Sequence, residues 1–225
     1  MSNNVPVITI DGPSGTGKGT ICKMLARYLG WNMLDSGAIY RVLAYSVLKN
    51  KIDVNNESAI IRCAEQLDFD FSFNDKDESR VILDNEDVTE EIRSEKCGQT
   101  ASKIAGISAV REVLLERQKQ FAKAPGLVTD GRDMGTVVFP EALFKIYLDA
   151  DVEERAKRRY LQLQDSKNNA SLAQVVEELK QRDQRDENRD HSPLKKADDA
   201  VYIDTTSLTI TQVFDFVLQL VNTRV

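Results

Sequence analysis

The stretch from Val5 to Leu29, VPVITIDGPSGTGKGTICKMLARYL, decides the fold. Its first part, residues 5–10, is an apolar run typical of a buried strand, and residues 21–29 carry apolar side chains at helical spacing. The segment between them consists of small residues and a single lysine, Lys18. A strand that passes through such a turn into a helix presents converging backbone N–H groups and the positive end of the helix dipole, which together bind phosphate. We therefore expect a nucleoside triphosphate site here.

The glycine-rich turn fits the spacing G-x-x-x-x-G-K, with Gly12, Gly17 and Lys18 at the fixed positions. The residue after the lysine is Gly19 where the consensus has Ser or Thr, and the hydroxyl follows at Thr20. This Gly-Lys-Gly-Thr form resembles the loop of nucleoside monophosphate kinases. An ordinary strand-to-helix turn is the alternative, but the flanking strand and helix favour a phosphate loop. The residues expected to bind ATP are Gly12, Pro13, Ser14, Gly15, Thr16, Gly17, Lys18, Gly19 and Thr20.

Composition narrows the possible classes of protein. The chain has 225 residues, of which 41% are hydrophobic and 29% charged, enough for one α/β domain with inserted subdomains. The net charge of −6 argues against coating nucleic acid, which needs a basic face. We see no secretory signal and no membrane-length apolar run. The three scattered cysteines are typical of free thiols in a reducing compartment. We therefore expect a cytoplasmic protein with neither nucleic acid nor membrane as a partner.

Apolar runs and helical patterns alternate along the chain, which predicts a parallel sheet with helices on both faces. The five predicted strands are Val5–Ile10, Trp31–Leu34, Leu127–Thr129, Phe144–Leu148 and Val201–Ile203. The predicted helices are 18–29, 37–50, 57–66, 101–124, 152–165, 172–190 and 209–222. A carboxylate follows every strand, at Asp11, Asp35, Asp130, Asp149 and Asp204. Ligands of such sheets bind beyond the carboxyl ends of the strands, so these aspartates mark the expected site.

One segment breaks the alternation. Residues 67–73 alternate apolar and polar side chains, the period of a half-buried strand, and a polar turn leads to a second apolar run at 80–83. This pattern predicts a small antiparallel sheet inserted between the second and third core strands. We expect a single α/β domain of the P-loop kinase class. Its core covers about 1–59, 101–150 and 191–225, an inserted subdomain covers about 60–100, and a helical lid covers about 151–190.

Arginines decide between a kinase and other phosphate-binding proteins. Two predicted helices carry them in clusters, at Arg155, Arg158 and Arg159 and at Arg182, Arg185 and Arg189. Interleaved aspartates make a solvated, salt-bridged helix the alternative for either cluster alone. Beside a phosphate loop, however, a lid bearing arginines neutralises the charge of phosphoryl transfer and excludes water. The sequence NKID at 50–53 matches a guanine-binding pattern, but it lies at a helix end and no D-x-x-G element precedes it, so we take it as coincidental.

Two further segments concern the phosphoryl acceptor. DSGAIYR, at 35–41, follows the second strand, and DGRDMG, at 130–135, follows the third. Each offers an arginine for a phosphate beside carboxylate or hydroxyl groups for a polar substrate. Tyr40, inside the first segment, is expected to line the nucleotide pocket. Lone His191 is expected to be a surface residue, since phosphoryl transfer needs little proton abstraction.

Taken in order, GPSGTGKGT, LDSGAIYR, DGRDMGTVVFP and RDQRDENRDHSPL resemble the motif set of bacterial cytidylate kinases over essentially the whole chain. The resemblance implies ATP-dependent phosphorylation of CMP and dCMP on an adenylate-kinase-like core. It also implies that the insert at about 60–100 is the NMP-binding region and that the protein is a monomer. We expect Mg²⁺ to bind with ATP and to be placed through Thr20, directly or through a water. Asp35 or Asp130 either holds metal-bound water or caps the following turn.

The resemblance also implies roles for individual residues. Phosphate contacts fall on Arg41, Arg132 and Arg189, and cytosine contacts on Ser36, Ser102, Arg111 and Asp133. Ribose contacts fall on Arg182 and Asp186, and Arg158 is the lid arginine that faces ATP and the transferred group. The implied catalytic set is Lys18, Arg132, Arg158 and Arg189. Ser102 is also consistent with simple packing in a helix.

Two alternatives remain open at this point. One is a kinase for another acceptor, such as UMP, AMP or shikimate. The other is a nucleotide-dependent switch or ATPase, which would hydrolyse ATP without an acceptor.

Overall fold

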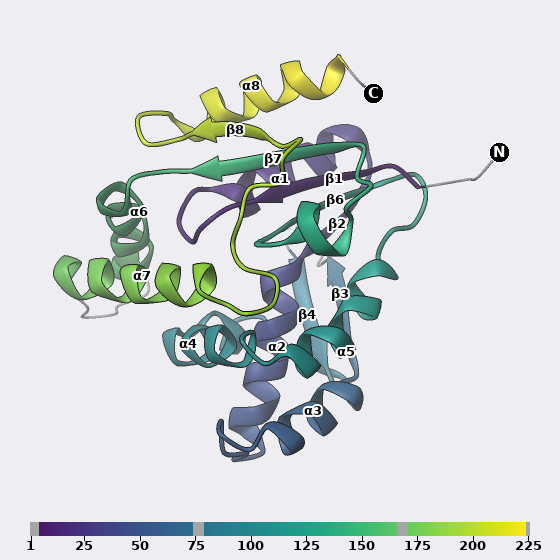
Figure 1. The fold of residues 1–225 in the computed structure, drawn as a ribbon, viewed down its shortest axis with the longest axis vertical. Coiled ribbons are helices and arrows are strands. Elements are labelled where there is room, and N and C mark those ends of the chain that lie inside the picture. The colour runs from purple at the N-terminus through teal and green to yellow at the C-terminus, as the bar shows by residue number, and fades with distance from the viewer. Residues whose placement is uncertain (1–4, 74–78, 166–170, 224–225) are drawn as a thin grey trace. The chain divides into compact units, whose positions relative to one another are not determined.

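The structure is a computed structural model that describes residues 5–73, 79–165 and 171–223. The chain divides into two compact units (Figure 1). The first unit combines Met1–Asp35 with Gln118–Val225, and the second is Ser36–Arg117. The insert expected at about 60–100 lies within the second unit.

A five-stranded parallel sheet forms the centre of the first unit. Its strand order is β2-β6-β1-β7-β8, so the phosphate loop follows the middle strand. The strands are β1 (Val7–Asp11), β2 (Asn32–Asp35), β6 (Leu127–Gly131), β7 (Phe144–Asp149) and β8 (Val201–Asp204). All five predicted strands are confirmed, and each runs on to include its terminal aspartate. β1 and β6 are buried along their whole length, as expected for interior strands covered on both faces.

Two helices complete the main apolar core of this unit. α1 (Lys18–Leu29) packs against α8 (Ile210–Asn222), and both contribute to a cluster built on Ile8, Ile10 and Ile146. α8 begins at a capping box. The Thr209 hydroxyl oxygen accepts from the backbone N–H of Gln212, and the Gln212 side-chain oxygen accepts from the backbone N–H of Thr209.

α6 (Val152–Asp165) and α7 (Leu172–Glu187) form a helix pair that follows the carboxyl end of β7 (Figure 1). The pair has its own small apolar cluster of Ala156, Leu163, Val175 and Leu179. A capping box at Ser171 begins α7. The two helices therefore pack on each other through a core separate from that of the sheet.

The second unit combines helices with the predicted antiparallel sheet. Strands β3 (Phe69–Phe73), β4 (Ser79–Leu83) and β5 (Glu86–Asp87) pair in that order, which confirms the inserted sheet. The helices are α2 (Ser36–Lys49), α3 (Glu57–Glu65), the short η1 (Glu91–Arg93), α4 (Glu95–Ile104) and α5 (Ser108–Lys119). The segment NKID at 50–53 follows the end of α2 and turns through positive φ at Lys51, as expected for a helix end.

The single helix predicted over 101–124 is wrong. The structure has two helices there, α4 ending at Ile104 and α5 beginning at Ser108. The break falls at Gly106, whose high backbone entropy disfavours a continuous helix, and Ala105 and Gly106 turn back to bond Ala101 O and Lys103 O. Ser102 and Arg111 therefore lie on separate helices. Within the described ranges, no helix has the length and apolar character needed to cross a membrane.

Candidate active site

The phosphate loop leaves β1 and enters α1 through glycines in conformations that other residues avoid. Gly12, Gly15 and Gly17 have φ of 145°, 86° and 89°. A Cβ on Gly12 would lie 2.0 Å from Leu148 O of the neighbouring strand, so no larger residue fits there. Gly17 precedes α1 and supplies no side-chain cap, which leaves the first N–H groups of the helix available to an anion.

Lys18 lies inside this loop. Its Nζ donates to Pro13 O at 2.9 Å, and the Thr16 hydroxyl donates to the same carbonyl at 3.2 Å. Only 8% of Lys18 is exposed. Burial, reinforced by the positive charge of Arg132, lowers the pKa of Lys18 to about 7, although Asp130 opposes the shift. The loop is thus a buried cationic site in which an entering phosphate group would favour the charged form of the lysine.

Asp130, at the end of β6, lies beside the start of α1. Both of its carboxylate oxygens are 3.9 Å from the position of a Cβ on Gly19, and Oδ1 is buried with no hydrogen-bond partner among the described residues. Burial and then the nearby Asp35 raise the pKa of Asp130 to about 8. A buried acceptor without a partner, next to the phosphate loop, is suited to a cation or to water held by one.

These observations test whether the site suits Mg²⁺. No cluster of three or more acidic, histidine or cysteine side chains able to hold a metal occurs in the part of the chain that the structure describes. Mg²⁺ bound with a nucleotide needs only one or two protein ligands, because phosphates and waters supply the rest. The exposed Thr20 hydroxyl and the unpartnered Asp130 Oδ1 fit that requirement.

Three of the expected acceptor residues are brought together by ion pairs. Arg132 Nε donates to Asp186 Oδ2 at 2.8 Å, and Arg189 donates to the other carboxylate oxygen of Asp186. The Asp186 side chain is 2% exposed, and that of Arg132 is 15% exposed. Burial by itself would raise the pKa of Asp186, but Arg132, Arg189 and Arg182 hold it below its usual range. One buried carboxylate thus brings together guanidinium groups for which the resemblance implied contacts with phosphate and sugar.

Arg155 of α6 contacts the phosphate loop and α7. Arg155 is 5% exposed; its Nε donates to Ala150 O at 2.8 Å and its Nη1 to Ser14 O of the phosphate loop at 3.1 Å. Its Nη2 also pairs with Asp183 of α7 at 2.7 Å. Arg155 of α6 therefore contacts both the phosphate loop and α7, and it links the loop to the α6–α7 pair.

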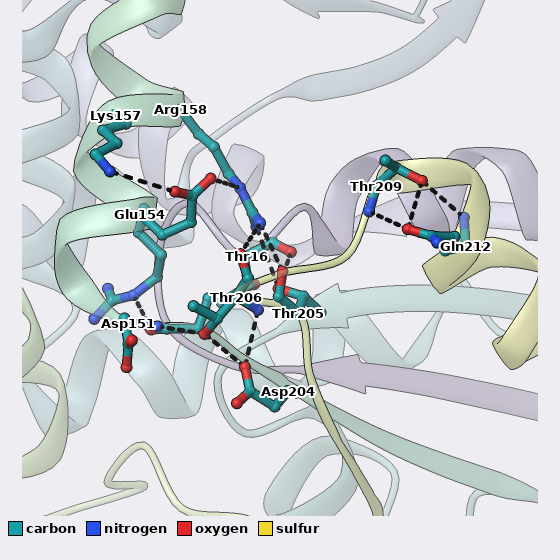
Figure 2. Close-up of polar contacts among 12 residues, drawn as sticks. Thr16, Asp151, Glu154, Lys157, Arg158, Asp204, Thr205, Thr206, Thr209 and Gln212 are labelled. Carbon is teal, nitrogen blue, oxygen red and sulfur yellow. Dashed lines mark hydrogen bonds and ion pairs between the residues drawn. The ribbon is translucent and has the colours of Figure 1, made fainter.

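Arg158 contacts the segment that follows β8 (Figure 2). Its Nη2 donates to Thr205 O at 2.6 Å and its Nη1 to Thr205 Oγ1 at 3.2 Å, while Nε pairs with Glu154. The Thr205 hydroxyl is itself within 3.3 Å of Thr16 O in the phosphate loop. Arg158 is thus placed next to the loop, and its contact with a phosphate stays a prediction. Thr205 was missed in the sequence, which offers no motif around it.

Several other predicted site residues belong to the second unit. The Arg111 guanidinium lies 5.6 Å from the centre of the Tyr40 ring. Arg41 Nη1 donates to Ile92 O at 2.8 Å, and its guanidinium packs against Gly98. Ser36 and Ser102 are buried, and Ser102 Oγ has no hydrogen-bond partner in the described ranges. Asp133, 3% exposed, belongs to the first unit. That the residues of both units bind one nucleotide therefore stays a prediction.

Comparison with known proteins identifies the family of this chain. The family model for cytidylate kinase matches residues 8–223. The chain is 53% identical over 220 residues to a cytidylate kinase of Shewanella denitrificans, covering 97% of each chain. It is 50% identical over 224 residues to one of Vibrio parahaemolyticus, covering 100% of this chain and 99% of that one.

Among solved structures, the chain is similar to a gluconokinase from Sinorhizobium meliloti 1021. It is 11% identical with a TM-score of 0.48, and the match covers 96% of this chain and 91% of that one. A likeness of this degree says nothing about the substrate. The full-length matches in sequence, however, include the phosphate loop and both acceptor segments, and the chain belongs to the cytidylate kinase family, whose enzymes phosphorylate CMP and dCMP with ATP.

Proposed function

We propose that this chain transfers the γ-phosphoryl group of ATP directly to a phosphate oxygen of CMP or dCMP, in line and without a covalent intermediate. The observation that carries the proposal is the position of Lys18 within an uncapped, glycine-lined helix start. Such a loop holds the β- and γ-phosphates through backbone N–H groups, and its lysine follows the charge as it moves. Transfer then depends on positioning and on electrostatic stabilisation.

The acceptor phosphate is proposed to bind Arg41, Arg132 and Arg189. In the first unit, Arg132 and Arg189 are already oriented by Asp186. Because their charges are desolvated, a phosphate gains more from them than it would from arginines in water. Arg182 and Asp186 are proposed to contact the sugar, and Arg158 and Arg159 to close over the transferred group from the α6–α7 lid.

Cytosine recognition is proposed to use Asp133 and Arg111, with Ser36, Ser102 and Tyr40 lining the base. Cytosine carries an amino donor at N4 beside acceptors at N3 and O2, so a carboxylate can accept from N4 while an arginine donates to the acceptor edge. Uracil reverses the pattern at N3 and O4. It would leave buried polar groups unpaired, at about 1–3 kcal/mol for each group. The unpartnered Ser102 hydroxyl supports its place in this pocket.

Mg²⁺ is the proposed cofactor, held by the Thr20 hydroxyl directly or through water and by water ordered at Asp130 or Asp35. When bound, it neutralises the charge of the phosphate oxygens. We also propose that the protein acts as a monomer in the cytoplasm. The free thiols of Cys22, Cys63 and Cys97 are compatible with a reducing compartment.

The test is a panel of acceptors with ATP and coupled detection of ADP: CMP, dCMP, UMP, AMP and shikimate. We expect CMP and dCMP to be used best and ATP to be hydrolysed slowly without an acceptor. Lys18→Met should lower kcat by a factor on the order of 10²–10³, the usual loss when a charge-stabilising group is removed. Lys157→Met, at a lysine with a 63% exposed side chain, is the matched control. Full turnover in Lys18→Met, or fast hydrolysis that no acceptor stimulates, would contradict the proposal.

A further inference from the structure

Asp11, the last residue of β1, bonds to a segment more than a hundred residues away. Its Oδ1 accepts from the Met134 backbone N–H at 2.9 Å, and its Oδ2 accepts from the Gly135 N–H at 2.8 Å. Both donors belong to the short helical segment η2 (Met134–Val138). Asp133, the residue before η2, supplies no side-chain cap, so the Asp11 carboxylate takes over that function from another strand.

The segment that Asp11 holds carries two predicted acceptor residues. Arg132 and Asp133 lie between Gly131, where β6 ends, and the Met134 N–H that Asp11 accepts. A Cβ on Gly135 would lie 2.8 Å from Thr9 Oγ1, so the turn rests directly on β1. The turn is therefore fixed at both ends, by β6 on one side and by the two bonds to Asp11 on the other.

The environment of Asp11 explains why a carboxylate is needed. Asp11 is only 4% exposed, and each of its two carboxylate oxygens accepts a backbone N–H group. Burial raises the pKa of Asp11 to about 6, while the two backbone N–H groups and Lys18 lower it and Asp133 raises it. An ionised carboxylate can accept at both oxygens, whereas an asparagine has only one acceptor and would turn an N–H₂ group toward the second donor.

We propose that Asp11 is a positioning residue for the acceptor nucleotide: by holding the N–H groups of Met134 and Gly135, it fixes the backbone that carries Arg132 and Asp133. The proposal rests on the proposed function of those two residues. According to this proposal, Asp11 affects the binding of CMP, although the next residue in the sequence, Gly12, begins the loop that binds ATP. A merely structural role would affect the two nucleotides equally.

The test compares Asp11→Asn with wild-type protein in steady-state kinetics, varying CMP and ATP separately. We expect the KM for CMP to rise roughly tenfold, as for the loss of one hydrogen bond to a charged acceptor, while the KM for ATP changes by less than about twofold. The preference for CMP over UMP should fall as well, because Asp133 is displaced. Asp53→Asn is the matched control, since Asp53 also accepts a backbone N–H, from Asn55 at 2.9 Å, but in an exposed loop.

Two results would overturn the proposal. One is an equal rise in both KM values, and the other is a lower unfolding temperature with unchanged kinetics.

Asp11→Asn is isosteric and is used because Asp11→Ala risks misfolding. Arg132→Ala and Asp133→Asn, measured in parallel, separate this failure from failure of the proposed function. If they leave the use of CMP unchanged, the proposed function is at fault; if they impair it while Asp11→Asn does not, the role of Asp11 is refuted.

Discussion

The buried carboxylate of Asp186 allows a quantitative test of the arginine cluster. It accepts from Arg132 Nε at 2.8 Å and from Arg189, and its side chain is 2% exposed. Removing one partner of a buried ion pair destabilises a protein by about 3–5 kcal/mol, because a charge is left uncompensated. The Arg132 side chain keeps 15% exposure and can regain some water, so we expect about 3 kcal/mol for Asp186→Ala. This is less than the usual total of about 5–15 kcal/mol, so the variant should still fold.

Urea unfolding followed by fluorescence provides the assay. The only tryptophan of the chain, Trp31, packs against the main core of the first unit and so reports on the unit that contains Asp186. The slope of the free energy of unfolding against urea concentration should stay constant, while the midpoint of the unfolding transition falls. Glu187→Gln is the matched control, at an exposed position next in sequence. Inorganic phosphate should partly restore the stability of Asp186→Ala, because an anion can replace the lost carboxylate between the arginines.

The pH dependence of this stability has a defined sign. The arginines hold the pKa of Asp186 in the folded protein below its usual range. The contribution of Asp186 to stability is therefore present in full above its pKa in the unfolded chain, which is about 4. It is lost as the pH falls through the folded pKa. The difference between wild type and Asp186→Asn should therefore shrink below about pH 4. A loss under about 0.5 kcal/mol for Asp186→Ala at pH 7, or no effect of phosphate, would refute the reasoning.

Two further predictions concern the phosphate loop. Gly12→Ala should abolish folding or lower stability by more than about 3 kcal/mol, since its Cβ would overlap Leu148 O. Gly30→Ala should cost only about 1 kcal/mol, because Gly30 has φ 65° and nothing lies within 4 Å of its Cβ position. Thermal unfolding measures the stability of both variants. Binding of ATP at pH 8 should take up protons, because the pKa of Lys18 is lowered to about 7 in the free protein and a triphosphate raises it. Titration calorimetry in two buffers of different ionisation enthalpy measures this uptake, and Lys18→Arg, always charged, should abolish it. An unchanged uptake in Lys18→Arg would contradict the assignment to this lysine.

Local patterns in the sequence predicted most of the fold. The five strands of the parallel sheet and the inserted antiparallel sheet follow from apolar runs and alternation, which depend on neighbouring residues only. The helix predicted over 101–124 is wrong because the chain turns at Gly106 between α4 and α5, and this glycine was the signal against a continuous helix. The short helix η2 was not predicted, because its start is capped by Asp11 from a distant strand.

The candidate site was predictable as motifs and not as contacts. The glycine-rich spacing identified the loop around Lys18 directly. The pairing of Arg132 with Asp186, in contrast, joins positions 54 residues apart, and the resemblance implied separate roles for them. Arg158 shows the same limit, because its bonds to Thr205 depend on where the chain passes after β8. Contacts between distant segments follow from the packing of the whole unit, which no local pattern encodes.

The aspartates that end the strands show how packing gives similar residues different chemistry. In the sequence, the five positions look equivalent, since each follows an apolar run. The strand order places Asp130 and Asp11 on the adjacent interior strands β6 and β1, where they are 5% and 4% exposed and their pKa values rise. Asp35 and Asp204 end the two edge strands and are exposed. Because burial sets the cost of charge, the buried Asp130 and Asp11 differ in chemistry from the exposed aspartates of the edge strands, although all of them follow an apolar run. Exchanging the interior carboxylates for amides should therefore change nucleotide binding, while Asp204→Asn should leave it unchanged in the same kinetic assay.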